Sequence, residues 1–185
     1  MGYSAKAIAN TMLDIAEAHG ETLSPLKLLK LVYIAHGWHL GFTKEPLVED
    51  ELAEAWQYGP VFPGIYHEFK KFGRSPIRGR ATEIEFPDIG SNGEIDLNPS
   101  VATPCVEKSD AFVMQLLEKV WSQYGRYSAI ALSNLTHKEQ TPWHRKHSDA
   151  ENLRNVDIPN EMIEEHYSEL VNANRVKREA SGAAR

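Results

Sequence analysis

Residues 24–41, SPLKLLKLVYIAHGWHLG, are the stretch that most constrains the fold. On an α-helix at about 100° per residue, their apolar side chains cover most of the circumference. One narrow line along this helix comprises Lys27, Lys30, Gly37 and Gly41, with Ile34 in its middle. Neither end of this line carries a bulky apolar side chain. A helix that is apolar almost all round is buried, and internal lysines and histidines argue against a membrane span. The stretch predicts a buried central helix at about 25–41.

The start of this helix carries a recognisable signal. Ser24 is expected to cap the free backbone N–H groups with its side chain, and Pro25 occupies the first helical position, where a missing N–H is tolerated. Lys27 and Lys30 are the charged residues of the helix. We expect each to reach solvent along its edge or to meet acidic groups, including those of a partner.

The rest of the chain favours a mainly α fold, a single-domain helical bundle around the central helix. Apolar periodicity and capping residues predict further helices at 4–19, 60–73, 109–124, from 128, from 142 and at about 159–177. A small β-hairpin or short strands are expected in 52–57 and 82–97. The weak alternation in 82–86 is expected to pair with 52–57, and Asn92-Gly93 carries a turn signal.

The domain organisation follows from changes in composition along the chain. Residues 1–150 are expected to form one helical domain, in which the polar, Gly- and Pro-containing stretch 74–107 is a surface excursion. Residues 151–185 are expected to add a C-terminal helix and a disordered tail, EASGAAR.

Charge and cysteine content limit the classes of function. The net charge of −6 argues against a nucleic-acid partner, since such proteins are usually basic at least locally. The single cysteine, Cys105, excludes an internal disulfide and favours a reducing compartment. No signal peptide or membrane segment is expected, so the predicted location is the cytoplasm.

Histidines provide the strongest hint of catalytic or metal chemistry. His36 and His39 are three residues apart on the central helix, and His144 and His147 repeat this spacing downstream of His137. Such spacing suits metal ligation. However, no carboxylate or cysteine completes the first pair, and lysines and an arginine are interleaved with the second set. Partly buried or solvated histidines are the favoured interpretation.

No known catalytic arrangement stands beside these histidines. The sequence contains no phosphate-binding glycine loop, no Gly-x-Ser-x-Gly, no His-Glu-x-x-His and no Cys-x-x-Cys pair. Cys105 follows Pro104 in the polar excursion, without a helix start that would activate its thiol. We therefore expect no catalytic residue, no cofactor and no metal.

Three segments together resemble a known family. They are SPLKLLKLVYIAHGWHL, AWQYGPVFPGIYHEFKKFG with the following SPI, and LSNLTHKEQTPWHRKH, in this order. They are similar to the SocA-like Panacea domain over about residues 5–147. The resemblance implies a mainly helical fold with a small β element. It also implies an antitoxin that neutralises a cognate toxin protein by binding it.

The resemblance leaves alternatives open. One family member acts as a proteolytic adaptor that delivers its toxin to the Clp protease, so an adaptor role is the related alternative. A phage-related, metal-dependent hydrolase using His137, or His144 and His147, is the alternative from another class. Matched motif positions and aromatic residues near turns give the partner-binding candidates, which are Lys27, Lys30, Trp56, Tyr58, Tyr66, His137 and Trp143.

Overall fold

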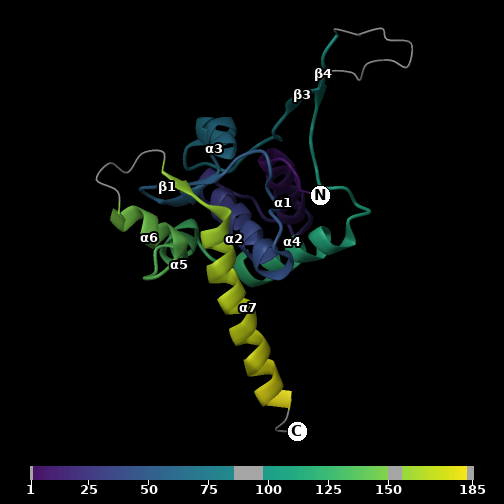
Figure 1. Cartoon of the computed structure of the whole chain (residues 1–185). Coiled ribbons are helices and arrows are strands. Elements are labelled where there is room, and N and C mark those ends of the chain that lie inside the picture. Colours follow the sequence, from purple (N-terminus) through teal and green to yellow (C-terminus); the bar gives the residue numbers. More distant parts are fainter. Residues whose placement is uncertain (1, 86–97, 150–155, 183–185) are drawn as a thin grey trace, which may run out of the picture.

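The computed structural model describes residues 2–85, 98–149 and 156–182, and these are mainly α-helical, as predicted. The α-helices are Ala5–Ala18 (α1), Pro25–Thr43 (α2), Pro63–Phe69 (α3), Ala111–Tyr124 (α4), Ala129–Thr136 (α5), Pro142–Asp149 (α6) and Asn160–Gly182 (α7), and a 3-10 turn, Lys70–Phe72 (η1), follows α3. The strands are Ala53–Trp56 (β1), Gly59–Val61 (β2), Glu83–Glu85 (β3), Ser100–Ala102 (β4) and Asp157–Ile158 (β5). Figure 1 shows their arrangement.

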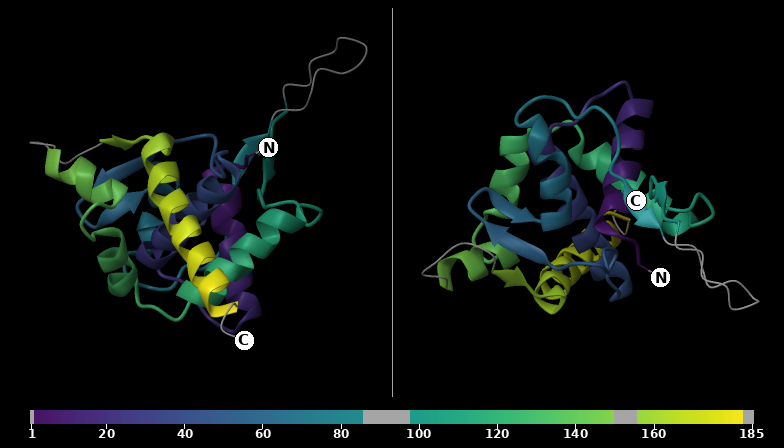
Figure 2. Two further views of the ribbon diagram at one scale, coloured as in Figure 1. Left: turned by 60° about the horizontal axis from the view of Figure 1, so that its bottom comes forward. Right: turned by 90° about the horizontal axis from the view of Figure 1, so that it is seen from above.

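Helix α2 is buried along most of its length and contacts α1, α3, α4, α5 and α7 as well as β2 (Figures 1 and 2). Pro25 is at its start, as expected, but the Ser24 side chain makes no capping hydrogen bond. The expectation of a side-chain cap there is therefore wrong. The helix ends at Lys44, whose backbone has a φ of 66°.

Gly37 and Gly41, on the line of α2 that is free of bulk, are covered by α7. A Cβ at Gly37 would lie 2.1 Å from Cε2 of Tyr167, and one at Gly41 would lie 2.9 Å from the carbonyl carbon of Tyr167. The Tyr167 ring also packs edge-on against Trp38, with centroids 5.4 Å apart. The two glycines thus allow α7 to approach α2 closely enough to bury a tyrosine between them.

The strands form two separate sheets. In the first, β1 is the central strand and pairs antiparallel with β2 and with β5, in the order β2-β1-β5. In the second, β3 pairs antiparallel with β4. The strands predicted near 52–57 and 82–86 both exist, but the expectation that they pair with each other is wrong. The hydrogen bonds of β1 are taken by its own hairpin and by the chain entering α7, and the Asn92-Gly93 turn lies outside the described residues.

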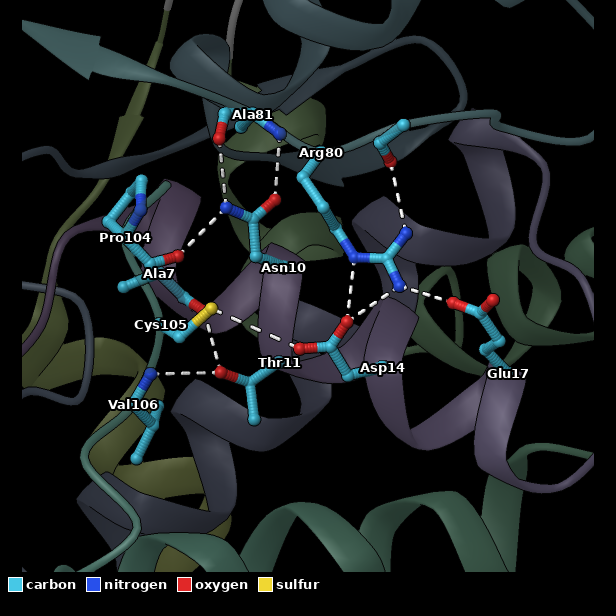
Figure 3. A network of polar contacts seen from close by, with 11 residues as sticks. Ala7, Asn10, Thr11, Asp14, Glu17, Arg80, Ala81, Pro104, Cys105 and Val106 are labelled. Carbon is cyan, nitrogen blue, oxygen red and sulfur yellow. Dashed lines mark hydrogen bonds and ion pairs between the residues drawn. The ribbon is translucent and has the colours of Figure 1, made fainter. Parts of the chain in front are cut away.

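The polar excursion at 74–107 is held to α1 by buried hydrogen bonds (Figure 3). Asn10 Nδ2 donates to the carbonyls of Ala81 and Pro104, at 3.0 and 2.8 Å, and Asn10 Oδ1 accepts from Ala81 N at 2.8 Å. Thr11 Oγ1 accepts from Val106 N at 2.9 Å. One turn of α1 therefore fixes both the entry and the exit of the excursion.

The C-terminal helix is longer than expected. It was predicted to end near Lys177 with a disordered tail, but α7 continues to Gly182, and residues 183–185 lie outside the described part. Its first half packs on α2, while residues 172–181 are exposed and project beyond the other helices (Figure 1). No helix among the described residues is long and apolar enough to cross a membrane.

Candidate functional site

Aromatic rings from β1, α3, α6 and the end of α5 pack together beside the β1–β2 hairpin. Trp56 packs edge-on against Tyr66 with centroids 4.6 Å apart. Trp143 stacks on His137 at 3.8 Å and lies tilted against His147 at 4.2 Å. Trp143 Nε1 donates to the backbone carbonyl of Trp56 at 2.7 Å, which joins the two ring groups. We call these five residues the aromatic cluster.

Lys30 lies beneath this cluster, fully buried. Its Nζ donates to the backbone carbonyl of Pro60 at 2.8 Å. It reaches neither solvent nor an acidic group, so the expectation from the sequence is wrong for this lysine. Burial lowers the pKa of Lys30 to about 7. The charge is disfavoured because the site is desolvated and no carboxylate compensates for the lost water.

At Gly59 the hairpin backbone lies against the polar side chains of Lys30, Thr136 and His137. The φ of Gly59 is +99°, which disfavours any side chain, and a Cβ there would lie 2.8 Å from Lys30 Nζ and 2.9 Å from both His137 Nε2 and Thr136 Oγ1. His137 Nε2 is buried and has no hydrogen-bond partner within the described chain. Burial lowers the pKa of His137, and the charges of Lys30 and His147 lower it further.

Tyr58 at the hairpin tip differs from its neighbours because 66% of its surface is exposed. Its backbone carbonyl accepts a hydrogen bond from Ser133 Oγ of α5 at 3.2 Å, which fixes the hairpin tip on the helix. Ile130, one turn before Ser133, is also 70% exposed. Tyr58 thus presents apolar surface on a tip that is held in place, and Ile130 presents it on the helix that holds the tip.

The structure brings six of the seven predicted partner-binding residues to this region and leaves one elsewhere. Lys27 instead contacts the C-terminal end of α4, where its Nζ donates to the carbonyl of Gly125 and sits 5.6 Å from the Trp121 ring centroid. Of the six, Tyr58 is exposed, Trp56, Tyr66 and His137 are half-buried, and Lys30 and Trp143 are buried. Because Lys30 and Trp143 are buried, they can affect a surface contact only by supporting the exposed residues above them.

The histidine pairs have structural partners. His36 accepts a hydrogen bond from Val48 N at Nδ1 (3.1 Å), and its Nε2 lies 3.0 Å from Asn160 Oδ1. Burial lowers its pKa to about 4. His39 Nδ1 lies 2.8 Å from the carbonyl of Glu45. The described residues contain no group of three or more His, Cys, Asp or Glu side chains that could hold a metal ion.

Sequence reasoning missed a residue that ties the hairpin to α5 and another that joins the end of α5 to the start of α6. Ser133 binds the Tyr58 carbonyl, and Thr141 Oγ1 donates to the carbonyls of Thr136 and Lys138, both at 2.8 Å. A hydroxyl residue one position before the helix start at Pro142 is a capping signal. It could have identified Thr141, but no local pattern points to Ser133.

Comparisons with known proteins show the family of this chain. The sequence profile of the antitoxin SocA-like Panacea domain matches residues 28–144, which include the whole aromatic cluster except His147, together with Lys30 and Gly59. The chain is 36% identical to Antitoxin SocA of Caulobacter vibrioides (strain NA1000 / CB15N) over 139 residues, covering 75% of this chain and 68% of that protein. No solved structure matches significantly. The chain belongs to the SocA-like Panacea family of antitoxin-like proteins.

Proposed function

We propose that this protein is an antitoxin that neutralises a cognate toxin protein by direct protein–protein binding. The observation that carries the proposal is the similarity to Antitoxin SocA, which extends over 75% of the chain. Because the matched span 28–144 includes α2, the hairpin, α4 and α5, the similarity concerns the folded body and not a short motif.

The proposed contact surface is the hairpin tip with Tyr58, flanked by Trp56 and Tyr66. Aromatic residues with a polar end are enriched among those that dominate binding energy at interfaces. Ser133 holds the tip, and Trp143 holds the backbone of Trp56. This surface is fixed before binding, so little conformational entropy is lost when a partner docks. Lys30 and His137 are positioning residues beneath it.

We further propose that the protein is not an enzyme and acts by covering its toxin. The groups that meet at the hairpin are indole, phenol, imidazole and one buried amine, all packed or hydrogen-bonded as a scaffold. A nucleophile, a base that activates it and donors for a developing anion would be needed for catalysis. The cluster supplies no such combination among its described members.

Co-expression with the product of the adjacent gene tests the proposal. That product alone should arrest growth, and this protein should restore growth and co-purify with the product as a complex. A harmless neighbour, or rescue without a complex, would refute the proposal. Toxin that disappears only in cells containing Clp protease would replace masking by the adaptor alternative.

Tyr58 can be tested with a matched control. Tyr58→Ala should weaken the complex by about 10-fold or more, because truncating a central aromatic removes on the order of 1.4 kcal/mol or more. Tyr127→Ala removes another exposed tyrosine, 38% accessible, from the turn between α4 and α5, and should leave the affinity unchanged. Equal effects of the two changes would remove the hairpin tip from the interface.

A further inference from the structure

A second apolar surface lies between α2, α4 and the projecting half of α7, and it shares no residue with the hairpin tip. A hollow of about 320 Å³ is lined by apolar side chains of all three helices, namely Trp38, Phe42, Leu116, Val120 and Val171. A second hollow, of about 700 Å³, shares Phe42, Leu116 and Lys119 with the first and extends along α4 past Phe112. Because they share residues, the two hollows form one continuous surface, which we call the α7 groove.

The floor of the α7 groove exposes large aromatic surface to solvent. Phe42 is 55% exposed and Phe112 is 50% exposed, although both extend from helices whose other faces are buried in the core. The Phe42 ring stacks on Trp38 at 5.8 Å. Contiguous apolar surface of this kind usually marks a place where another molecule binds.

The rim of the first hollow is positively charged, in a protein whose net charge is −6, whereas the second hollow is lined by both Lys119 and Glu118. Lys119 of α4 and Arg175 and Arg178 of α7 line the first hollow. The Lys119 and Arg178 side chains form no ion pair with any described residue, and Arg175 has one exposed pair, with Glu179 at 3.9 Å. A groove with an apolar floor and unneutralised cations on its rim is complementary to an amphipathic segment with acidic residues beside its apolar face.

We propose that the α7 groove binds an acidic amphipathic helix of the toxin protein, in addition to the contact at the hairpin tip. This inference rests on the proposed antitoxin function, whose partner it describes. The first half of α7 is anchored on α2 through Tyr167, so the projecting half offers a fixed wall against which a partner helix can lie.

A second copy of the same chain fits the groove less well. In a two-fold dimer the same patch faces itself, so Lys119, Arg175 and Arg178 would face a rim that carries the same three cations, with Glu118 as the acid that lines the groove. Like charges in an interface are unfavourable. Charge therefore favours an acidic partner.

A binding experiment with defined peptides tests the chemistry of the groove directly. The probe is a synthetic helical peptide with leucines on one face and glutamates on the other, and the comparison peptide carries lysines in place of the glutamates. The full chain should bind the glutamate peptide, measured by fluorescence anisotropy at physiological salt, at least about 10-fold more tightly than the lysine peptide.

Matched variants locate the binding site on α7. Arg178→Glu reverses a rim charge and should weaken glutamate-peptide binding by about 10-fold. Lys177→Glu makes the same charge change one residue earlier, on a different face of the helix, and should change affinity by less than about 3-fold, since distant charges are screened. Phe42→Ala should weaken binding by removing part of the floor. Equal effects of Arg178→Glu and Lys177→Glu, or an unaffected Phe42→Ala variant, would overturn the proposal.

The complex with the adjacent gene product separates this inference from the antitoxin proposal. If the complex forms and Arg178→Glu and Phe42→Ala both weaken it, the groove holds the toxin. If it forms but neither variant affects it, the groove inference is refuted while the antitoxin function stands. Glutamate-peptide binding without any complex would refute the antitoxin function and leave only the chemistry of the groove.

Two further experimental results would show that the groove binds something other than an acidic helix of the toxin. A dimer in analytical ultracentrifugation that Phe42→Ala dissociates would assign the groove to a second copy and overturn the proposal. Binding to phosphatidylglycerol vesicles, lost in Arg178→Glu and without binding of the glutamate peptide, would also overturn it in favour of an anionic membrane surface.

Discussion

Replacing Lys30 by methionine should change how the stability of the protein depends on pH. The Lys30 amine is fully buried, and its pKa is lowered from 10.5 to about 7 by burial. In the unfolded chain the same amine regains its ordinary pKa. Between about pH 7 and 10.5, the unfolded state therefore binds one more proton at this residue than the folded state does.

The sign of the effect follows from this difference in bound protons. The free energy of unfolding rises with pH wherever the unfolded state binds more protons, by about 1.36 kcal/mol per pH unit for one full proton. Between pH 7.5 and 9.0, Lys30 should therefore add about 2 kcal/mol to the free energy of unfolding. Below pH 7 both states are protonated at Lys30, so its contribution no longer changes.

The assay is urea unfolding of the wild type and Lys30→Met at several values of pH from 7.5 to 9.0. Over this range the free energy of unfolding of the wild type should rise by about 2 kcal/mol more than that of the variant. The slope is the relevant quantity, because methionine also leaves the Pro60 carbonyl without its donor and so changes the absolute stability. Lys27→Met, one turn earlier on the same helix, should keep the wild-type slope. Parallel curves for the wild type and Lys30→Met would refute the reasoning.

Three further perturbations test the packing described above. Gly37→Ala should destabilise the protein by about 1–3 kcal/mol, because a Cβ there would lie 2.1 Å from the Tyr167 ring, and Tyr167→Leu should relieve part of that loss in a double-mutant cycle followed by thermal unfolding. Asn10→Leu should lower the free energy of unfolding by about 3 kcal/mol, since it leaves two buried backbone groups of Ala81 and the part-buried carbonyl of Pro104 unpaired. The exposed Asn172→Leu should change the free energy of unfolding little in the same urea titration. Because the pKa of His36 in the folded protein is about 4, the free energy of unfolding of the wild type should fall by up to about 3 kcal/mol as the pH falls from 6.5 towards 4. A His36→Gln variant that shows the same decline would contradict this assignment.

The sequence predicted most helices well because their signals are local, but the helix expected from residue 60 begins only at Pro63, because Gly59–Val61 pair with β1 as strand β2. Apolar periodicity, the prolines at helix starts and the capping residues Asp110 and Ser128 all act within one or two turns. The line through Gly37 and Gly41 also signalled a close approach. It could not identify Tyr167 as the residue that fills the space, because that contact joins positions more than a hundred residues apart.

Apart from the Ser24 cap, which is a local error, the main errors concern partners that lie far apart in the sequence. The partner of Lys30 is a backbone carbonyl at Pro60, and a carbonyl has no signature in an amino-acid sequence. The weak alternation in 82–86 indicated a strand but carried no information on its register or neighbour, so the pairing with 52–57 was wrong. The α7 groove was not predicted at all, because Phe42 and Phe112 look like core residues until the packing shows that about half of each stays exposed.

The attachment of the excursion to α1 has a practical consequence for labelling the protein. Asn10 holds Ala81 and Pro104 at one point, so the chain that leaves the body at one of them returns to it at the other (Figure 3). An affinity tag or fluorophore-binding peptide inserted between β3 and β4 would lengthen a loop whose base is already closed, at an entropic penalty that grows only slowly with length. Such an insertion offers a reporter that leaves the hairpin tip and the α7 groove free.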